Sequence, residues 1–326
     1  MQEESFKSDQ IKSWGDKPYY SLDHYFKKTF GTKVYKIALN AGMTCPVRDG
    51  TLGSRGCIFC SKGGSGDFAS AAAVDGKPDI KTQLEEGKKL VSSKNPAKYL
   101  AYFQAYTNTY APADELRMLY KVALDDKDVI GISIATRPDC LPDEVLSLLD
   151  ELKKEYPEKV IWIELGLQTI HRETVKYIRR GYETSVFELA VHRLNDMGIP
   201  VVVHVILGLP GETVEMMHST IEYLNTFPIF GIKLQLLHVL NGTDMADDFA
   251  DRKFDVLTRS EYTDIVISCL ELLSPEIVIH RLTGDGPKSI LIAPGWSGDK
   301  KTVMNGIHSE MKKRKAYQGR LFKCNL

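Results

Sequence analysis

The feature that most constrains this chain is a regular alternation of apolar runs with segments of helical periodicity. Six apolar runs predict strands, at residues 33–39, 99–106, 129–135, 160–165, 201–207 and 231–237. The run at 201–207 is apolar apart from one histidine, which is typical of a strand covered on both faces. Segments between the runs, such as 142–155, place apolar residues at helical spacing. Repeated strand-then-helix units predict a parallel sheet with right-handed crossovers, and so an α/β fold.

The six units are too few for a closed barrel. A complete eight-unit barrel takes about 250 residues, whereas the last predicted unit here ends by residue 245. We therefore predict an open, partial (β/α)6 barrel over 33–245, with an N-terminal arm at 1–32 and a C-terminal extension at 246–326. In such barrels the chemistry lies at the carboxyl ends of the strands, so the motifs that follow the strands form the candidate site.

Composition limits the classes of protein that the chain can represent. Hydrophobic residues make up 43% and charged residues 26% of its 326 residues, which is ordinary for a soluble globular protein. The N-terminus lacks the apolar core of a signal peptide, and no apolar run approaches the ~20 residues of a membrane span. We expect a cytoplasmic protein with reduced thiols. The net charge of −1 means that any site for a polyanion must be a local patch.

Three of the six cysteines occur in one stretch, from Cys45 to Cys60. Eleven residues separate Cys45 from Cys57, and two separate Cys57 from Cys60. A two-residue gap lets both thiolates face one metal ion or cluster. Two interpretations follow from the spacing: an iron–sulfur cluster with one iron left open, or a zinc site completed by a remote ligand such as Cys140.

This stretch resembles the cluster loop of the radical S-adenosylmethionine (SAM) enzymes, and its wide first gap is similar to that of the Elongator catalytic subunit and its bacterial relatives. The resemblance implies that Cys45, Cys57 and Cys60 hold a [4Fe–4S] cluster and that SAM chelates the open iron. It implies one-electron cleavage of SAM to a 5′-deoxyadenosyl radical, and the partial-barrel architecture. Phe59 would then flank the adenine, the alternative being a core phenylalanine.

The ends of the second and third predicted strands match the family less well. The family has two glycines followed by Glu or Thr after the second strand, whereas this chain has Gln104 and Thr107, which could accept hydrogen bonds from the SAM amino group. The third strand ends in Ala-Thr-Arg-Pro-Asp, which resembles Glu-Thr-Arg-Pro-Asp with Ala135 in place of the glutamate. Arg137 could bind a substrate carboxylate bidentately or form a structural salt bridge.

The fourth strand ends in Glu-Leu-Gly-Leu-Gln-Thr, which resembles the family's Glu-Leu-Gly-Val-Gln-Ser. The resemblance implies that Gln168 binds the ribose of SAM and that Arg180, twelve residues further on, pairs with the SAM carboxylate. Glu164 lies in an apolar run and needs a partner if it is buried. It is a candidate cofactor ligand, with a structural salt bridge as the alternative.

One histidine interrupts the fifth predicted strand, and another follows the sixth. His204 precedes Gly-Leu-Pro-Gly-Glu-Thr, which resembles the glycine turn that brings backbone at Gly208 close to the adenine. His204 would lie near the SAM ribose or the substrate, or be a satisfied core histidine. His238 is a candidate for the substrate side of the site.

The last segment is basic. Residues 311–326 contain no acid, and aromatic residues are interleaved with the cations Lys312, Lys313, Arg314, Lys315, Arg320 and Lys323. Such a segment suits phosphate contacts and base stacking, so these lysines and Arg314 are candidate RNA contacts. A solvated terminal helix is the alternative.

The resemblance covers residues 33–245 and extends to single-domain bacterial proteins that lack the acetyltransferase half of Elongator. It implies modification of the 5-substituent of the tRNA wobble uridine, from a carboxymethylaminomethyl to an aminomethyl group. Its partners would be tRNA, an electron donor such as flavodoxin or ferredoxin, and a tRNA methyltransferase. The alternatives are a radical SAM enzyme for a small metabolite such as a porphyrin, and a non-enzymatic zinc-containing RNA-binding protein. Cys140, Cys269 and Cys324 are expected to be idle thiols.

Overall fold

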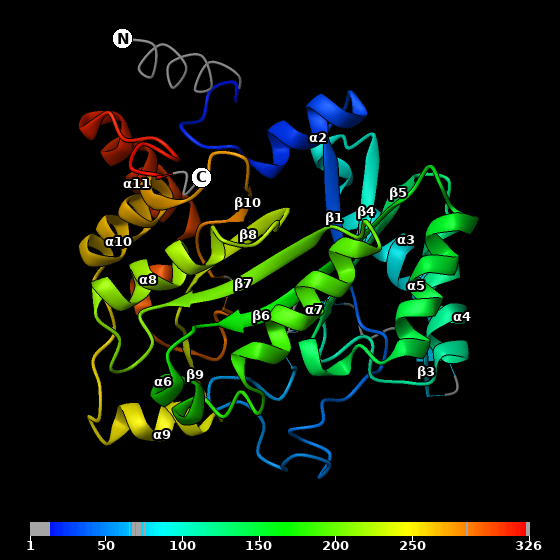
Figure 1. Ribbon diagram of the computed structural model, residues 1–326, viewed down its shortest axis with the longest axis horizontal. Coiled ribbons are helices and arrows are strands. Elements are labelled where there is room, and N and C mark those ends of the chain that lie inside the picture. Colours follow the sequence, from blue (N-terminus) through cyan, green and yellow to red (C-terminus); the bar gives the residue numbers. More distant parts are fainter. Residues whose placement is uncertain are drawn as a thin grey trace. The chain divides into compact units, whose positions relative to one another are not determined.

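The protein is described by a computed structural model that covers residues 14–64, 66, 69, 73–74, 76–284 and 286–323 (Figure 1). The start of the predicted arm, residues 1–13, and Cys324 lie outside the described residues. The chain forms two compact units. The cluster-loop unit comprises Phe26–Gly166 and Arg179–Val202, and the C-terminal unit comprises Met1–Tyr25, Leu167–Ile178 and Val203–Leu326.

Seven strands form one sheet in the order β1-β4-β5-β6-β7-β8-β10. Pairing is parallel between β1 and β4, β4 and β5, β5 and β6, and β8 and β10. The strands are β1 (Val34–Leu39), β4 (Lys98–Phe103), β5 (Val129–Thr136), β6 (Val160–Gln168), β7 (Val201–Leu207), β8 (Gly231–Leu236) and β10 (Val278–Arg281). The six predicted strands and the parallel α/β fold are confirmed, and the C-terminal segment supplies the seventh strand.

Helices follow the strands as the periodicity predicts. The longer ones are α2 (Leu22–Phe30), α3 (Ile80–Val91), α4 (Ala113–Leu124), α5 (Asp143–Glu155), α7 (Thr184–Asp196), α8 (Val214–Leu224), α10 (Arg259–Leu272) and α11 (Lys300–Arg314). The short elements are β2 (Ala73–Val74), β3 (Lys77–Pro78), β9 (Val239–Leu240), β11 (Leu291–Ala293), α6 (Arg172–Tyr177), α9 (Asp244–Ala250), η1 (Ser92–Lys94), η2 (Pro138–Cys140) and η3 (Gly295–Gly298). The short helix α6 ends at Tyr177, and Arg179 just beyond it adopts a left-handed conformation with φ 56°.

The core of the cluster-loop unit is built on β5, all eight residues of which are buried. Gly131 is required there: its φ is 155°, and a Cβ atom would lie 1.9 Å from the carbonyl oxygen of Val160 on β6. α5 buries Val145, Leu148 and Leu152 along one side, and each such side chain contributes about 1.5–3 kcal/mol of transfer free energy. Gly131 therefore lets the first part of β5 pack closely against the start of β6.

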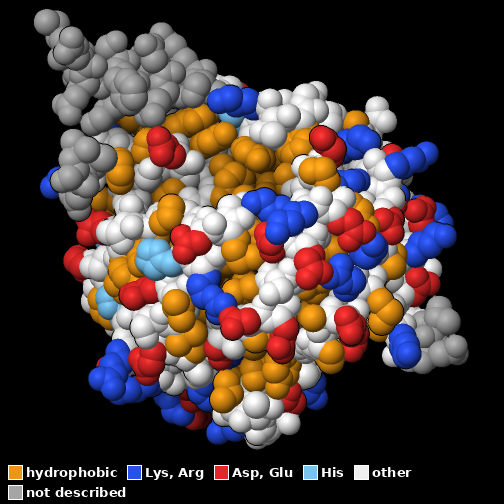
Figure 2. All heavy atoms as spheres, turned by 45° about the vertical axis from the view of Figure 1, so that its right-hand side comes forward, with side chains coloured by type: hydrophobic (Ala, Val, Ile, Leu, Met, Phe, Trp, Pro, Cys, Tyr) orange, Lys and Arg blue, Asp and Glu red, His pale blue; other side chains and the backbone are white. Residues whose placement is uncertain are grey.

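The exposed surface mixes both signs of charge. On the face drawn in Figure 2, Lys and Arg side chains alternate with Asp and Glu side chains. Ion pairs such as Arg117–Glu151 and Lys121–Glu155 join α4 to α5, although exposed pairs of this kind stabilise a protein little. Within the described part of the chain, no helix has both the length and the apolar character that crossing a membrane requires.

Candidate cofactor site

A long loop follows β1 in the cluster-loop unit (Figure 1). It contains Cys45, Cys57 and Cys60. All three are free thiols, and each residue is partly exposed. The carbonyl oxygen of Cys45 accepts a hydrogen bond from the backbone N–H of Arg48 at 2.8 Å, and that of Cys57 accepts one from Cys60 at 3.1 Å. The loop is therefore held by its own backbone, and Phe59 lies partly exposed between two of the thiols.

The three thiols interact electrostatically. Residue Cys57 keeps some exposure, but burial of its thiol raises the pKa to about 12, and the neighbouring Cys60 and Cys45 thiols act in the same direction. Arg137 and Arg48 act in the opposite direction. Binding of a metal or cluster at Cys57 must therefore release a proton, because the thiolate is the metal ligand.

The donor set consists of three cysteine thiols in one loop. In the part of the chain that the structure describes, no three His, Cys, Asp or Glu side chains are arranged to hold a single metal ion. A zinc site needs ligands that converge on one point, whereas an iron–sulfur cluster binds each thiolate at a different iron atom. Cys45, Cys57 and Cys60 are the residues that would bind the cluster that radical SAM enzymes use, each at a different iron atom.

The side chain of Arg48 forms hydrogen bonds to the backbone of the cluster loop. Its Nη2 donates hydrogen bonds to the carbonyl oxygens of Cys60 at 2.6 Å and Ser61 at 2.7 Å. Gly56 has a φ of 73°, and a Cβ atom there would lie 2.7 Å from Arg48 Nε. Arg48 was not singled out by the sequence analysis, since its partners are backbone carbonyls.

The loop after β4 is tied to the cluster loop. The backbone N–H of Gln104 donates to the carbonyl of Leu39 at 3.1 Å, and that of Thr107 donates to the carbonyl of Thr44, next to Cys45, at 3.2 Å. Thr107 is buried, whereas Gln104 is partly exposed. Both predicted SAM-binding residues therefore lie in a segment that adjoins the thiols, and their roles stay predictions.

Asn108 was missed by the sequence analysis. It is fully buried, and its Nδ2 donates to the carbonyl oxygens of Phe103 at 3.1 Å and Ala135 at 3.0 Å. The Oδ1 atom has no hydrogen-bond partner. Asn108 thus joins the ends of β4 and β5 beside Ala135, and an asparagine in a polar loop gives no sequence signal of such a role.

Arg137 forms the salt bridge that was one of its two predicted roles. Its Nε and Nη2 donate to the Asp139 carboxylate at 2.9 and 2.7 Å, and its Nη1 donates to the carbonyl of Arg180 at 2.7 Å. Burial alone would lower the pKa of Arg137, but the hydrogen bonds and charge of Asp139 raise it above its usual range. A substrate carboxylate would have to compete with Asp139.

Arg180 is 2% exposed and fixed in orientation. Its Nη2 donates to the carbonyl of Tyr182 at 3.0 Å and to Oγ1 of Thr184 at 3.1 Å. Its guanidinium lies 4.5 Å from the centre of the Tyr182 ring, and that of Arg137 lies 4.8 Å from the same centre. Burial lowers the pKa of Arg180. The two predicted arginines are thus brought together on one tyrosine ring.

Glu164, in the middle of β6, also has partners within the protein. Its Oε1 accepts hydrogen bonds from Lys36 Nζ at 2.8 Å and from Ser133 Oγ at 2.6 Å. The side chain of Glu164 is fully buried, and that of Lys36 is 21% exposed. The Lys36 ammonium also lies 5.0 Å from the centre of the Tyr102 ring. This arrangement favours the structural salt bridge over cofactor binding.

Gln168, in the C-terminal unit, differs from Glu164. Its φ is 65°, an unusual conformation for a residue other than glycine. Its Oε1 atom is buried without a hydrogen-bond partner. The next residue, Thr169, donates through Oγ1 to Glu212 in the turn after β7. A strained backbone and an unused buried acceptor are what a ligand-binding residue at this position would show.

Three other predicted residues lie in the C-terminal unit. His204 is partly exposed on β7. Gly208 has a φ of 84°, and a Cβ atom there would lie 2.7 Å from Leu257 Cδ1, so the turn needs glycine. His238 packs under the turn after β10: a Cβ atom at Gly284 would lie 2.6 Å from its Cε1 atom.

The basic segment is an ordered helix end. Met311 and Ala316 are buried, and α11 ends at Arg314, followed by the C-cap residue Lys315 with a φ of 54°. Arg314 Nε donates to Glu310 at 2.7 Å, and Lys313 lies 3.5 Å from the same carboxylate. The four cations from Lys312 to Lys315 are exposed. Acids outside the segment therefore neutralise part of its charge, while the surface remains accessible.

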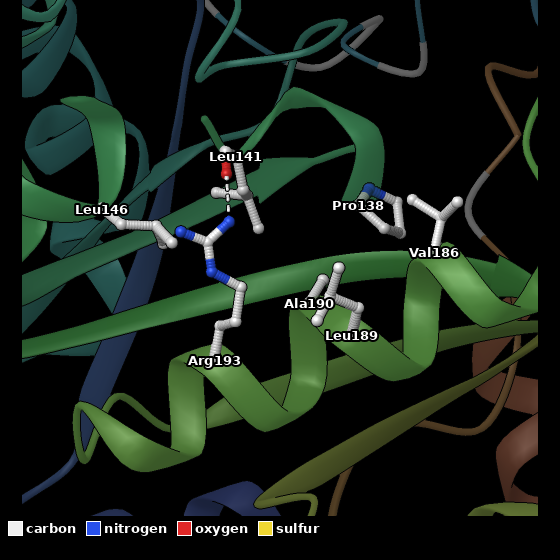
Figure 3. A pocket seen from close by; sticks show the side chains of 7 residues that line it. All are labelled: Pro138, Leu141, Leu146, Val186, Leu189, Ala190 and Arg193. Carbon is white, nitrogen blue, oxygen red and sulfur yellow. Dashed lines mark hydrogen bonds between the residues drawn. The ribbon is translucent and has the colours of Figure 1, made fainter. Parts of the chain in front are cut away.

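A small hollow of about 40 Å³ lies between η2, the start of α5 and α7 (Figure 3). Apolar side chains such as Pro138, Leu146 and Ala190 line it, together with Arg193, whose Nη1 donates to the carbonyl of Leu141 at 3.5 Å. None of the residues predicted to bind cofactor or substrate lines this hollow.

Comparison with family models identifies two matches. The radical SAM superfamily model matches residues 51–224, and the Radical_SAM C-terminal domain model matches residues 229–313. Protein YtqA of Bacillus subtilis (strain 168) is 42% identical over 308 residues, which are 94% of this chain and 94% of YtqA.

Similarity to the Elongator group is more distant. A tRNA uridine(34) acetyltransferase of Methanocaldococcus infernus is 22% identical over 198 residues, which are 60% of this chain and 35% of that protein. The structure of Elp3 from the same archaeon aligns with a TM-score of 0.65 at 16% identity, covering 87% of this chain and 64% of the Elp3 chain. The shared fold confirms the predicted partial barrel.

Proposed function

The chain belongs to the radical SAM superfamily, and from this membership and its relation to the Elongator group we propose that it modifies the 5-substituent of the tRNA wobble uridine. Enzymes of this superfamily use a [4Fe–4S] cluster and SAM. The proposed change is of the carboxymethylaminomethyl to aminomethyl type, and a partner methyltransferase would then act on the amine.

One observation carries the substrate proposal: the similarity to a tRNA uridine(34) acetyltransferase over 198 residues. The match covers 35% of that relative's length, so most of the relative has no counterpart in the matched region. The accessible cations Lys312 and Lys315 are compatible with phosphate contacts.

The residues of the cluster-loop unit fit the cofactor. Cys45, Cys57 and Cys60 would hold the cluster through three thiolates. When bound, the cluster and SAM would supply one-electron radical chemistry for abstraction of a hydrogen atom from a carbon beside the substrate amine. Arg48 keeps the loop closed through the carbonyls of Cys60 and Ser61.

Other residues would orient SAM. Arg180 has its guanidinium fixed by Tyr182 and Thr184, so a carboxylate that reaches it meets a donor already in place. Gln168 keeps a buried acceptor that suits a ribose hydroxyl. The backbone at Gly208 allows close approach of a planar ring. Glu164 and Arg137 would stabilise the fold around the site, because their charged groups already form ion pairs with Lys36 and Asp139.

The test has two parts. The protein is reconstituted with iron and sulfide under anaerobic conditions, reduced with dithionite and assayed for 5′-deoxyadenosine with and without tRNA. We expect 5′-deoxyadenosine from the native protein and none from Cys57→Ala. Mass spectrometry of tRNA nucleosides from cells with and without the gene then tests the substrate. Identical nucleosides in both strains would overturn the wobble-uridine proposal and leave SAM cleavage standing.

A further inference from the structure

The residues between Cys45 and Cys57 form a compact turn, here called the Cys45–Cys57 turn. The carbonyl of Pro46 accepts hydrogen bonds from the backbone N–H groups of Leu52 at 2.7 Å and Gly53 at 3.3 Å. Gly50 N–H donates to the carbonyl of Gly53 at 3.1 Å. Two residues suffice between Cys57 and Cys60, so bringing thiols together does not by itself require a turn of this length.

The turn presents an apolar side chain to water. Leu52 is 57% exposed, whereas Pro46 and Val47 beneath it are buried. Asp49 accepts a hydrogen bond from the N–H of Thr51 at 3.0 Å, which further fixes the tip. The backbone of this solvent-exposed leucine is already fixed by hydrogen bonds, so it loses little conformational entropy when a partner protein covers the side chain. Such a residue is suited to be an apolar contact at a binding surface.

Cations flank the exposed leucine. Residues 45–64 contain Arg48, Arg55 and Lys62 against one acid, Asp49, in a chain whose net charge is −1. Arg48 is turned to the carbonyls of Cys60 and Ser61, while Arg55 and Lys62 are exposed. The local excess of positive charge favours an acidic partner.

We propose that the Cys45–Cys57 turn docks an acidic one-electron carrier protein, with Leu52 as the apolar anchor and Arg55 and Lys62 as the guiding cations. This inference rests on the proposed radical SAM function. The turn is covalently continuous with Cys45 and Cys57, whose residues are partly exposed, so a protein seated on it lies beside the thiols. The carrier would be oxidised by one electron and the bound cluster reduced by one electron, and no bond forms or breaks in this step.

The test compares two electron sources on the reconstituted protein. The variants are Leu52→Ser and the double variant Arg55→Glu/Lys62→Glu. Their matched controls are Leu90→Ser, at a leucine that is 83% exposed on α3, and Lys89→Glu, on the same helix. The probe is a flavodoxin: the Kd of its oxidised form is measured at low and high salt, and its reduced form is compared with dithionite as the electron source for SAM cleavage.

We expect each turn variant to raise the Kd for flavodoxin about tenfold and to slow flavodoxin-driven cleavage, with dithionite-driven cleavage and iron content unchanged. The charge reversal should also abolish the salt dependence. Unchanged flavodoxin binding in the turn variants would overturn the proposal. Turn variants that lose tRNA binding but keep flavodoxin binding would also overturn it. Absence of dithionite-driven cleavage in the native protein would instead contradict the proposed function, so the two failures are distinguishable.

Discussion

Glu164, in the middle of β6, and Gln168, at its end, differ in whether their buried oxygen atoms accept hydrogen bonds within the protein. Glu164 is fully buried, yet Lys36 and Ser133 use its carboxylate within the protein. Gln168, four residues later, has a left-handed backbone and a buried Oε1 atom without a partner. Buried polar groups are normally hydrogen-bonded. The difference therefore separates a residue that stabilises the fold from one that is suited to bind a ligand.

The largest expected effect concerns the three thiols of the cluster loop. Cys57→Ala should reduce bound iron and acid-labile sulfide to background, because a three-thiolate set loses one of its donors. Iron and sulfide analysis of anaerobically reconstituted protein measures this. Cys269→Ala, at a buried thiol of α10, is the matched control and should retain the cluster. Full iron content in Cys57→Ala would contradict the assignment.

Breaking the Glu164 pair should cost stability. Glu164→Ala removes the carboxylate that Lys36 contacts at 2.8 Å, and we expect the free energy of unfolding to fall by about 3 kcal/mol. Urea unfolding measures the change. The double variant Glu164→Ala/Lys36→Met should recover most of the lost stability, because it also removes the Lys36 ammonium that Glu164→Ala leaves without its carboxylate. If Glu164→Ala instead weakens SAM binding at unchanged stability, Glu164 is a cofactor ligand and the contrast along β6 fails.

Gln168 should give the reverse result. Gln168→Ala should raise the Kd for SAM about tenfold, the value of one hydrogen bond of about 1.4 kcal/mol, with little change in stability. Gln168→Gly should also weaken SAM binding but raise the free energy of unfolding by about 1 kcal/mol, because glycine tolerates a positive φ. Calorimetric titration of the reconstituted protein with SAM tests both. Unchanged affinity in both variants would remove Gln168 from the site.

The smallest effect is a pH dependence next to Gln168. Burial raises the pKa of Glu212, partly offset by the hydrogen bond from Thr169. The folded state thus binds this proton more tightly, so the stability it contributes is fully present below its usual pKa of 4.5 and is lost as pH rises through the folded pKa. We expect Glu212→Gln to remove that loss and to raise stability at neutral pH.

Glu215 provides the control for this measurement. Its own backbone N–H, at the start of α8, lowers its pKa, so its contribution is present above the usual value and is lost as pH falls. Glu215→Gln should therefore lower stability slightly at neutral pH, opposite in sign to Glu212→Gln. Urea unfolding from about pH 4 to about pH 7 compares the two variants. Equal slopes would show that burial of Glu212 does not matter.

The parts of the fold that depend on local pattern could be predicted from the sequence. Apolar runs and helical periodicity gave six strands to within a few residues, since buried parallel strands are continuously apolar. The pairing of the short segment Val278–Arg281 with β8 could not be predicted, because that contact joins segments 47 residues apart, Gly231 with Val278. Periodicity within a segment carries no information on its neighbour.

The site shows the same limit. Motifs marked Gln168 and Glu164 alike as cofactor residues, because both belong to one matching stretch. What separates them is the pairing of Glu164 with Lys36, 128 positions earlier in the chain, and the φ of Gln168. Arg48 and Asn108 escaped notice for a related reason: their partners are backbone carbonyls, which every residue possesses.

The stacking of Arg137 and Arg180 on Tyr182 has a consequence for the electrostatics of the cluster-loop unit. Two permanent cations share one small volume, and the electron-rich faces of the ring reduce their mutual repulsion. Burial keeps the Tyr182 hydroxyl neutral by raising its pKa, and guanidinium groups do not titrate in the physiological range. The positive charge that Arg137 contributes near Cys57 therefore stays the same across the physiological pH range, while any change of charge at the neighbouring sulfur atoms takes place beside it.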